Sequence, residues 1–379
     1  MGRILTKAYT AINDNIVRVL FRRSIISREK TMDLQVVTFD KKKTSICKGI
    51  AALLLIFHHL FYLKPELYVI GQFGQGIPYQ IAEQCRVCLS IFTILSGYGI
   101  KKKFDTSSSL PPMKFCFNSV KKLYLNYLFY VAFSLAFMAI AGSLWSRLGT
   151  GIVAMLRLVL SMTATQFLVK NLGINIVWWY ITMLLCCYIS FPLINRFLIR
   201  YPKITAFICI ISISIGRISL GRIGIFEIIS WMAVFYFGCF LAIDHNLEKI
   251  AKIFDNRPII PTILFLMVFI IKIILCTSST TVRYLDFLFA LLLMLSILLM
   301  DTETKRIDVV FFSWVGSISM GIYYIHLLWI EYVPYKFVYF LPNSIVMFFV
   351  VFALSVATYY LLDRIKRRLH YFASALMHK

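Results

Sequence analysis

Charged residues are scarce in this chain, since only 15% of its 379 residues are Asp, Glu, Lys or Arg. Hydrophobic residues make up 60%, and apolar stretches long enough to cross a bilayer recur from residue 45 to residue 362. These two features exclude an ordinary soluble globular protein. The sequence therefore predicts an all-α polytopic membrane protein.

Negatively charged residues are scarcer than positively charged ones. The chain has 17 Asp and Glu and 40 Lys and Arg, which gives a net charge of +23. Such basicity also occurs in nucleic-acid-binding proteins. Here, however, the basic residues gather in short loops beside apolar runs, where they set membrane orientation and contact anionic lipids. We therefore expect membrane lipids, and no nucleic acid, among the partners.

Disulfide and metal-binding patterns are also lacking. Most of the nine cysteines lie inside apolar runs, which predicts neither a disulfide framework nor a particular redox compartment. Cys85 and Cys88 have the spacing of a zinc-binding pair, but no second pair of Cys or His accompanies them. We expect no metal site.

The first residues lack the compact apolar segment and small-residue cleavage site of a signal peptide. They mix apolar with basic residues, a pattern typical of a helix on a membrane surface. Met32 is an alternative start, because a chain beginning there leads directly into the first apolar run. The expected divisions are a basic interfacial segment, a transmembrane domain and a basic cytoplasmic tail, at residues 1–44, 45–362 and 363–379.

The apolar runs predict about ten transmembrane helices. They lie near residues 45–63, 82–100, 123–143, 176–195, 203–217, 225–243, 258–276, 284–300, 309–331 and 343–362. A further run, 150–169, has Arg157 at its centre. If that run crossed, every later basic loop would face outward, so we expect a partly embedded or re-entrant segment on the outer side. Both termini are then cytoplasmic.

The first apolar run contains a lysine and two histidines. At about 100° and about 1.5 Å per residue, Lys48 and His59 share one helix face roughly 16 Å apart. His58 lies about 80° off that face. A lysine near a span end also fits simple snorkelling, whereas a histidine inside a span usually faces a polar cavity or a helix partner. The spacing predicts an anion site at Lys48 and acid/base chemistry at His59.

A second intramembrane histidine lies in the run 309–331. Ser319, Tyr323 and His326 follow i, i+4, i+7 spacing and therefore share one helix face. This polar stripe fits either catalytic groups or hydrogen bonds between helices.

Small residues and lysines mark the end of the second run, which reads Ser96, Gly97, Tyr98, Gly99 and, after one residue, Lys101, Lys102 and Lys103. Glycines permit close backbone approach, and exposed amides beside lysines can hold a phosphate at the cytoplasmic face. Helix packing around small residues explains the same segment equally well.

Several motifs in order resemble the membrane acyltransferase-3 family over about Lys48 to Asp363. The matching features are Lys48, His59, the Ser96 to Gly99 segment, Trp178-Trp179-Tyr180, Phe235-Tyr236-Phe237-Gly238, and the Gly-x-Ile-Ser-x-x-Ile-Tyr-x-Ile-His stretch that ends at His326. The resemblance implies a ten-helix enzyme that transfers an acyl group, most often acetyl, from cytoplasmic acyl-CoA to a hydroxyl of a glycan or other envelope molecule.

Site residues carry over from the family at matching positions. His59 matches the family's essential histidine, and Lys48 matches its cationic partner, which is usually Arg and offers a planar fork instead of a point charge. Other recurrent positions are occupied by Ser96, Gly97, Tyr323 and His326. The chain departs from the family pattern at Ser90, where an acidic residue is frequent, and at Asp363, where Glu is frequent.

We therefore expect a membrane O-acetyltransferase that uses acetyl-CoA, with His59 as the base that takes the acceptor's hydroxyl proton. His326 and Tyr323 are expected to line the reaction chamber. The groups expected to hold the CoA phosphates are Lys48, Lys101, Lys102 and Lys122, beside Ser96 and Gly97. The first two spans resemble capsule-locus members, which favours a lipid-linked or nascent capsular or exopolysaccharide acceptor at a bacterial plasma membrane.

Two other classes of function remain open. A transporter or flippase for lipid-linked sugars would use buried His and Lys as proton or anion sites, but the two halves of the chain show no internal repeat. A receptor-like or scaffolding protein would use the basic tail. The acceptor sugar, the hydroxyl position, the acyl chain length and any self-association are not encoded in these patterns.

Overall fold

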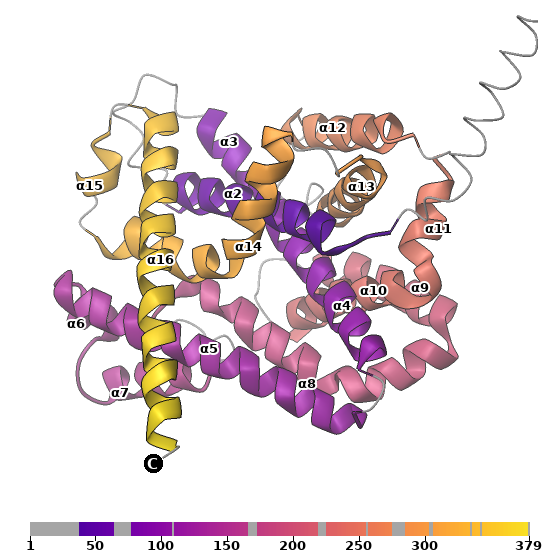
Figure 1. The fold of residues 1–379 in the computed structure, drawn as a ribbon. Helices are drawn as coiled ribbons and strands as arrows, with labels where there is room; N and C mark the ends of the chain where they lie inside the picture. The colour runs from indigo at the N-terminus through magenta and orange to yellow at the C-terminus, as the bar shows by residue number, and fades with distance from the viewer. Residues whose placement is uncertain are drawn as a thin grey trace, which may run out of the picture. The chain divides into compact units, whose positions relative to one another are not determined.

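The computed structural model describes residues 38–63, 77–107, 110–165, 173–218, 225–254, 257–274, 285–302, 306–333, 336–341 and 343–377. Within these ranges the regular structure is entirely helical (Figure 1). Phe39–Lys379 forms one compact unit. Most of the interfacial segment predicted for residues 1–44 lies outside the described residues.

The helices follow one another along the chain without an intervening strand in the described part. They are α2 (Lys41–Tyr62), α3 (Ile77–Gln84), η2 (Cys85–Val87), α4 (Cys88–Thr106), α5 (Pro112–Ile140), α6 (Leu144–Leu148), α7 (Gly151–Met162), η4 (Ile176–Trp178), α8 (Trp179–Arg200), α9 (Pro202–Ile218), α10 (Ile225–Ala242), η5 (Ile243–His245), α11 (Asn246–Lys252), α12 (Ile259–Ile274), α13 (Leu285–Leu299), α14 (Ile307–Leu327), η7 (Leu328–Tyr332), α15 (Lys336–Tyr339) and α16 (Ser344–Met377).

Six described helices are long and apolar enough to cross a membrane, which makes this a helical membrane protein. They span Lys41–Tyr62, Pro112–Ile140, Trp179–Arg200, Ile228–Lys252, Ile307–Tyr332 and Ser344–Leu369. Shorter apolar helices include α12 and α13, which fall on two more of the predicted spans. The ten-helix count and the orientation of the termini stay predictions.

Three predicted spans differ from the helices found, and one of them, 343–362, continues as α16 to Met377. The run 82–100 is divided among α3, the 3₁₀ turn η2 and α4. Helix α5 begins at Pro112, well before the expected residue 123. A proline in the first helical turn loses no hydrogen bond and has a φ suited to a helix, so the Pro111-Pro112 pair starts α5 early.

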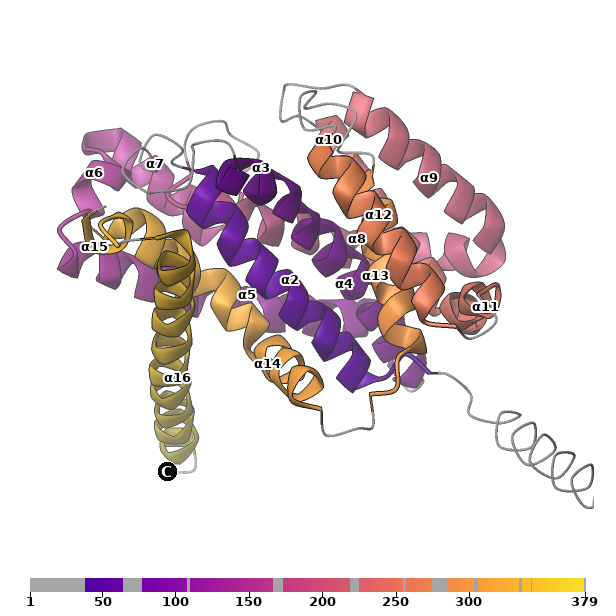
Figure 2. The same cartoon turned by 90° about the horizontal axis from the view of Figure 1, so that it is seen from above.

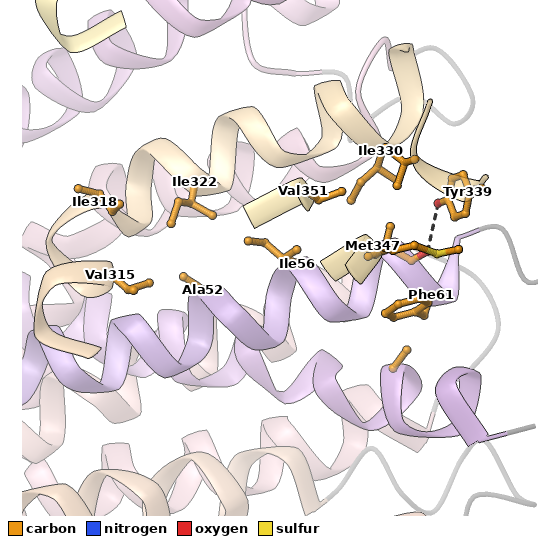
Figure 3. Packing of buried hydrophobic residues seen from close by; sticks show 13 residues of the cluster. Ala52, Ile56, Phe61, Val315, Ile318, Ile322, Ile330, Tyr339, Met347 and Val351 are labelled. Atoms are coloured by element: carbon orange, nitrogen blue, oxygen red, sulfur yellow. Dashed lines mark hydrogen bonds between the residues drawn. The ribbon is translucent and has the colours of Figure 1, made fainter. Parts of the chain in front are cut away.

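Helices α2 and α14 pack closely because glycines remove side chains from their crossing. A Cβ on Gly49 would overlap the carbonyl oxygen of Phe312, and a Cβ on Gly316 would overlap that of Ser45. Beyond the crossing, Ile56 of α2 faces Ile322 of α14 in a hydrophobic cluster that extends toward η7 and α16 (Figure 3). The two helices therefore run in the same direction.

A second pair of helices, α4 and α10, also packs closely at glycines. A Cβ on Gly97 would overlap the Phe235 carbonyl oxygen, and a Cβ on Gly238 would overlap that of Ile94. The Cys239 thiol lies 3.2 Å from the Gly97 carbonyl oxygen. Small residues thus bring both helix pairs into backbone contact.

The first residues of α2 and α14 and the end of α16 lie toward one end of this unit, at the bottom of Figure 2. Helices α3, α6 and α7 lie toward the opposite end. At the first end, Lys43 donates to the Leu298 carbonyl oxygen (2.7 Å) and Lys42 to that of Thr302. Lys43 therefore caps the last turn of α13, and Lys42 binds the chain just beyond that helix.

The predicted re-entrant run contains only one described helix, α7. Its 12 residues span about 18 Å, which is too short to cross a hydrocarbon core of about 30 Å. Ile152 is 75% exposed, while Arg157 donates to the Arg147 carbonyl oxygen (2.6 Å). Helix α5 holds α7 through Tyr127, whose hydroxyl donates to the Ser161 carbonyl oxygen (2.5 Å).

Candidate active site

Two intramembrane histidines meet where α2 and α14 pack together. The Nδ1 atom of His59 lies 2.9 Å from Nε2 of His326. The ring centroids are 5.0 Å apart. His326 is fully buried and His59 is half-buried, so the solvent-accessible surface of the pair belongs to His59.

The hydrogen-bond partners define which nitrogens carry protons. Nδ1 of His326 lies 2.8 Å from the Ile322 carbonyl oxygen, which can only accept, so this nitrogen carries the hydrogen. Nε2 of a neutral His326 is then an acceptor, and Nδ1 of His59 must donate to it. Nε2 of His59 is left with a lone pair. Nε2 of His59 can therefore accept a proton, while Nδ1 of the same ring is held by the buried ring of His326.

His58 has a different environment from its neighbour. Its Nδ1 atom donates to the Ala82 carbonyl oxygen of α3 (2.6 Å), and its ring stacks on Tyr62 with centroids 4.9 Å apart. Tyr62 in turn stacks on Tyr79 of α3 (5.5 Å). His58 thus joins α2 to α3, whereas His59 faces α14.

Hydroxyl-bearing residues of α4, α8 and α14 contact one another, and one of them, Tyr323, precedes His326 on α14. The Tyr323 ring, one turn before His326, lies 5.7 Å from that of Tyr180. Tyr180 OH lies 3.3 Å from the Ser96 hydroxyl. Tyr323 itself donates to the Val177 carbonyl oxygen of η4 (2.5 Å). Its proton is therefore used in holding η4, while the Ser96 and Tyr180 hydroxyls face each other.

The third member of the predicted polar stripe, Ser319, bonds within its own helix. Its hydroxyl donates to the Gly316 carbonyl oxygen (2.8 Å). This side chain is buried at the glycine crossing of α2 and α14.

Lys48 lies on α2 about two turns beyond the helix start and eleven residues before His59. Its side chain is half-buried, and no hydrogen bond or ion pair joins it to another residue in the described ranges. Helix α2 is continuous between the two residues, so the predicted separation of roughly 16 Å along one face applies.

The other predicted phosphate-binding residues lie in separate environments. Gly97 is buried against α10, as described above. Lys101 is buried and forms an ion pair with Asp105 one turn later. The Lys102 ammonium lies 5.8 Å from the centroid of the Tyr98 ring, and Lys122 is exposed on α5. Of this group, Lys102 is the partly accessible cation on α4.

A buried charge cluster was not predicted from the sequence. Lys272 of α12 and Asp286 of α13 form an ion pair with N and O 2.5 Å apart, and they are 1% and 2% exposed. Arg86 of η2 lies 3.9 Å from Asp286, and Lys272 also donates to the Gln84 carbonyl oxygen (3.3 Å). The available signal was that both Lys272 and Asp286 fall inside predicted spans, where ionisable residues are costly and usually paired.

In the part of the chain that the structure describes, no group of three or more His, Cys, Asp or Glu is placed to hold a metal ion. Cys85 and Cys88 are buried free thiols.

Comparison with known proteins identifies a family. The sequence model of an acyltransferase domain matches residues 45–364, which is 320 of the 379 residues and includes His59, Ser96 and His326. No curated protein and no solved structure matches the chain.

Proposed function

The chain belongs to acyltransferase family 3, and from this premise we propose that it is a membrane O-acetyltransferase. It moves an acetyl group from cytoplasmic acetyl-CoA to a hydroxyl of a lipid-linked or nascent surface polysaccharide, in the plasma membrane of a bacterium. The observation that supports this proposal most strongly is the hydrogen bond between His59 and His326, which leaves one ring nitrogen as a base.

In the proposed reaction, Nε2 of His59 takes the proton of the acceptor hydroxyl. The acceptor oxygen attacks the thioester carbonyl carbon, and the carbonyl electron pair moves onto the carbonyl oxygen. When the tetrahedral intermediate collapses, the C–S bond breaks and the electron pair leaves with sulfur, which takes the proton from His59. General base catalysis of this kind contributes typically about 10² to 10⁴ in rate.

His326 is a positioning residue in this proposal. By accepting the Nδ1 proton of His59, it selects the tautomer that can act as a base. It also stabilises the imidazolium that forms when His59 takes the second proton. The Ser96 and Tyr180 hydroxyls, which lie 3.3 Å apart, supply donors for the oxyanion.

Lys48 holds the CoA phosphates as a point charge. The pantetheine arm then follows the face of α2 for roughly 16 Å to His59. Lys102, at the end of α4, is the second cation for the phosphates, because Lys101 is already paired with Asp105. A transporter or flippase is not favoured by the match to an acyltransferase domain.

The proposal is tested on the polysaccharide product. Surface polysaccharide is purified from cells that lack the gene and carry either the native chain or His59→Ala, and O-acetyl signals are measured by proton NMR. The expected result is O-acetylation with the native chain and its loss with His59→Ala at equal protein level in the membrane. Undiminished O-acetylation in the variant would remove His59 as the base.

A further inference from the structure

A cavity of about 150 Å³ lies between α5, α14 and α16, apart from the histidine pair. Its lining combines aromatic rings with polar and charged groups, among them Asn126, Tyr130, Ser317, Tyr359, Asp363 and Lys366. This volume accommodates a polar head group and not merely one water molecule.

The cavity and the histidine pair lie on opposite faces of α14. Ser317 and Gly321 line the cavity, and at about 100° per residue His326 lies about 180° around the helix from Ser317. A Cβ on Gly321 would overlap the Tyr359 ring, so this glycine lets α16 approach α14 at the cavity. The cavity is therefore no part of the acyl-transfer site proposed above.

Positive charge is in excess around the cavity. Lys366 donates to the Asn126 side-chain oxygen, and its ammonium lies 5.5 Å from the Phe129 ring centroid. The one acidic residue in the lining, Asp363, forms an ion pair with Arg367 one turn later. Lys366 interacts electrostatically with Asp363 and, more weakly, with Lys122 of α5, which adds a further positive charge.

The cavity adjoins a surface that is suited to lipid. Leu361 of α16 is 57% exposed and Met320 of α14 is 39% exposed. The basic part of α16 extends toward the end of the unit where α2 and α14 begin, the end with the basic clusters predicted to be cytoplasmic (Figure 2). Basic pockets between transmembrane helices on that side bind anionic lipid head groups.

We propose that the cavity between α5, α14 and α16 binds the phosphate of an anionic phospholipid from the inner leaflet. Lys366 contacts the phosphate, Lys122 contributes long-range attraction, and the acyl chains lie along the exposed apolar surface beside Leu361 and Met320. The bound lipid bridges α5 and α16.

The test is equilibrium binding of phosphatidylglycerol or phosphatidylcholine to the purified full-length protein in detergent, measured by native mass spectrometry. Phosphatidylglycerol is expected to bind preferentially, and Lys366→Gln is expected to weaken it roughly fivefold, the effect of one lysine next to an anionic head group. Arg368→Gln, an exposed charge on α16 outside the lining, is the matched control and leaves binding unchanged. Ser317→Phe, which narrows the cavity without a change of charge, also weakens binding.

Equal weakening by Lys366→Gln and Arg368→Gln would overturn the proposal, because general surface basicity would then explain the binding. Displacement of the lipid by inorganic phosphate would identify a free-anion site and would also contradict it. None of these measurements depends on acetyl transfer, so the lipid site and the proposed function succeed or fail separately.

Discussion

At the scale of the residue, the site depends on how one imidazole is held by another. His59 and His326 are far apart in the chain, and each alone reads as an intramembrane histidine of undefined role. Their hydrogen bond of 2.9 Å, together with that from His326 to Ile322, orients the lone pair of His59 away from α14. His58, one residue earlier, bonds to α3 instead. Neighbouring residues of one type thus differ in chemistry because their partners differ.

The proposed role of Lys48 predicts how its substitution changes the use of acetyl-CoA. Lys48→Gln removes a positive charge without changing the length of the side chain greatly, and we expect the KM for acetyl-CoA to rise about 10-fold to 100-fold, with a smaller change in kcat. The reason is that a charge-assisted hydrogen bond to phosphate contributes about 1.5–3 kcal/mol. Steady-state kinetics with varied acetyl-CoA measure it.

The matched control for Lys48 is Lys249→Gln, which removes an exposed lysine of α11 outside the proposed site. An unchanged KM in both variants would show that Lys48 only snorkels to the membrane boundary.

At the scale of the element, glycine crossings decide which side chains meet. Gly49 and Gly316 bring α2 and α14 into backbone contact, and this register places His59 against His326. Gly97 does the same for α4 and α10. The phosphate cradle that the sequence also allowed stays a prediction. The packing explanation accounts for every contact of Gly97 that the structure describes.

Gly97 and Gly99 provide a matched pair for this interpretation. Gly97→Ala places a methyl group on the Phe235 carbonyl oxygen, and we expect about 1–3 kcal/mol of destabilisation, as in other overpacked sites. Gly99→Ala meets no atom within 4 Å, so we expect a neutral effect or a gain of up to about 1 kcal/mol from helix propensity. Thermal unfolding in detergent compares the two. A Gly97→Ala protein of native stability that has lost affinity for acetyl-CoA would instead support the phosphate cradle.

At the scale of the whole molecule, the sequence predicted the helical membrane architecture well, because long apolar runs have few other solutions. Interactions between segments far apart in the chain could not be predicted from the apolar runs. The pairing of Lys272 with Asp286 depends on how α12 and α13 pack, and the contact of Tyr323 with Val177 depends on the path of η4. The ion pair of Lys101 with Asp105 is an exception, since its i, i+4 spacing was visible in the sequence.

The arrangement of the helices within Phe39–Lys379 supports the proposed meeting of two substrates at one base. His59 lies where α2 and α14 pack together, and in the proposed function Lys48 and Lys102 hold the acyl donor on one side of it. Helices α3 and α7 lie toward the end of the unit opposite to the first residues of α2 (Figure 2). In this proposal, donor and acceptor react within the membrane domain, and His59 is the group that takes the proton.

The most direct measurement is release of free CoA from acetyl-CoA by the purified protein in proteoliposomes, with and without a polysaccharide acceptor. We expect acceptor-dependent thiol release with the native chain, retention of most of that rate in His58→Ala, and a loss of at least about 100-fold in His59→Ala. Acceptor-dependent release in His59→Ala at the native rate would contradict the account.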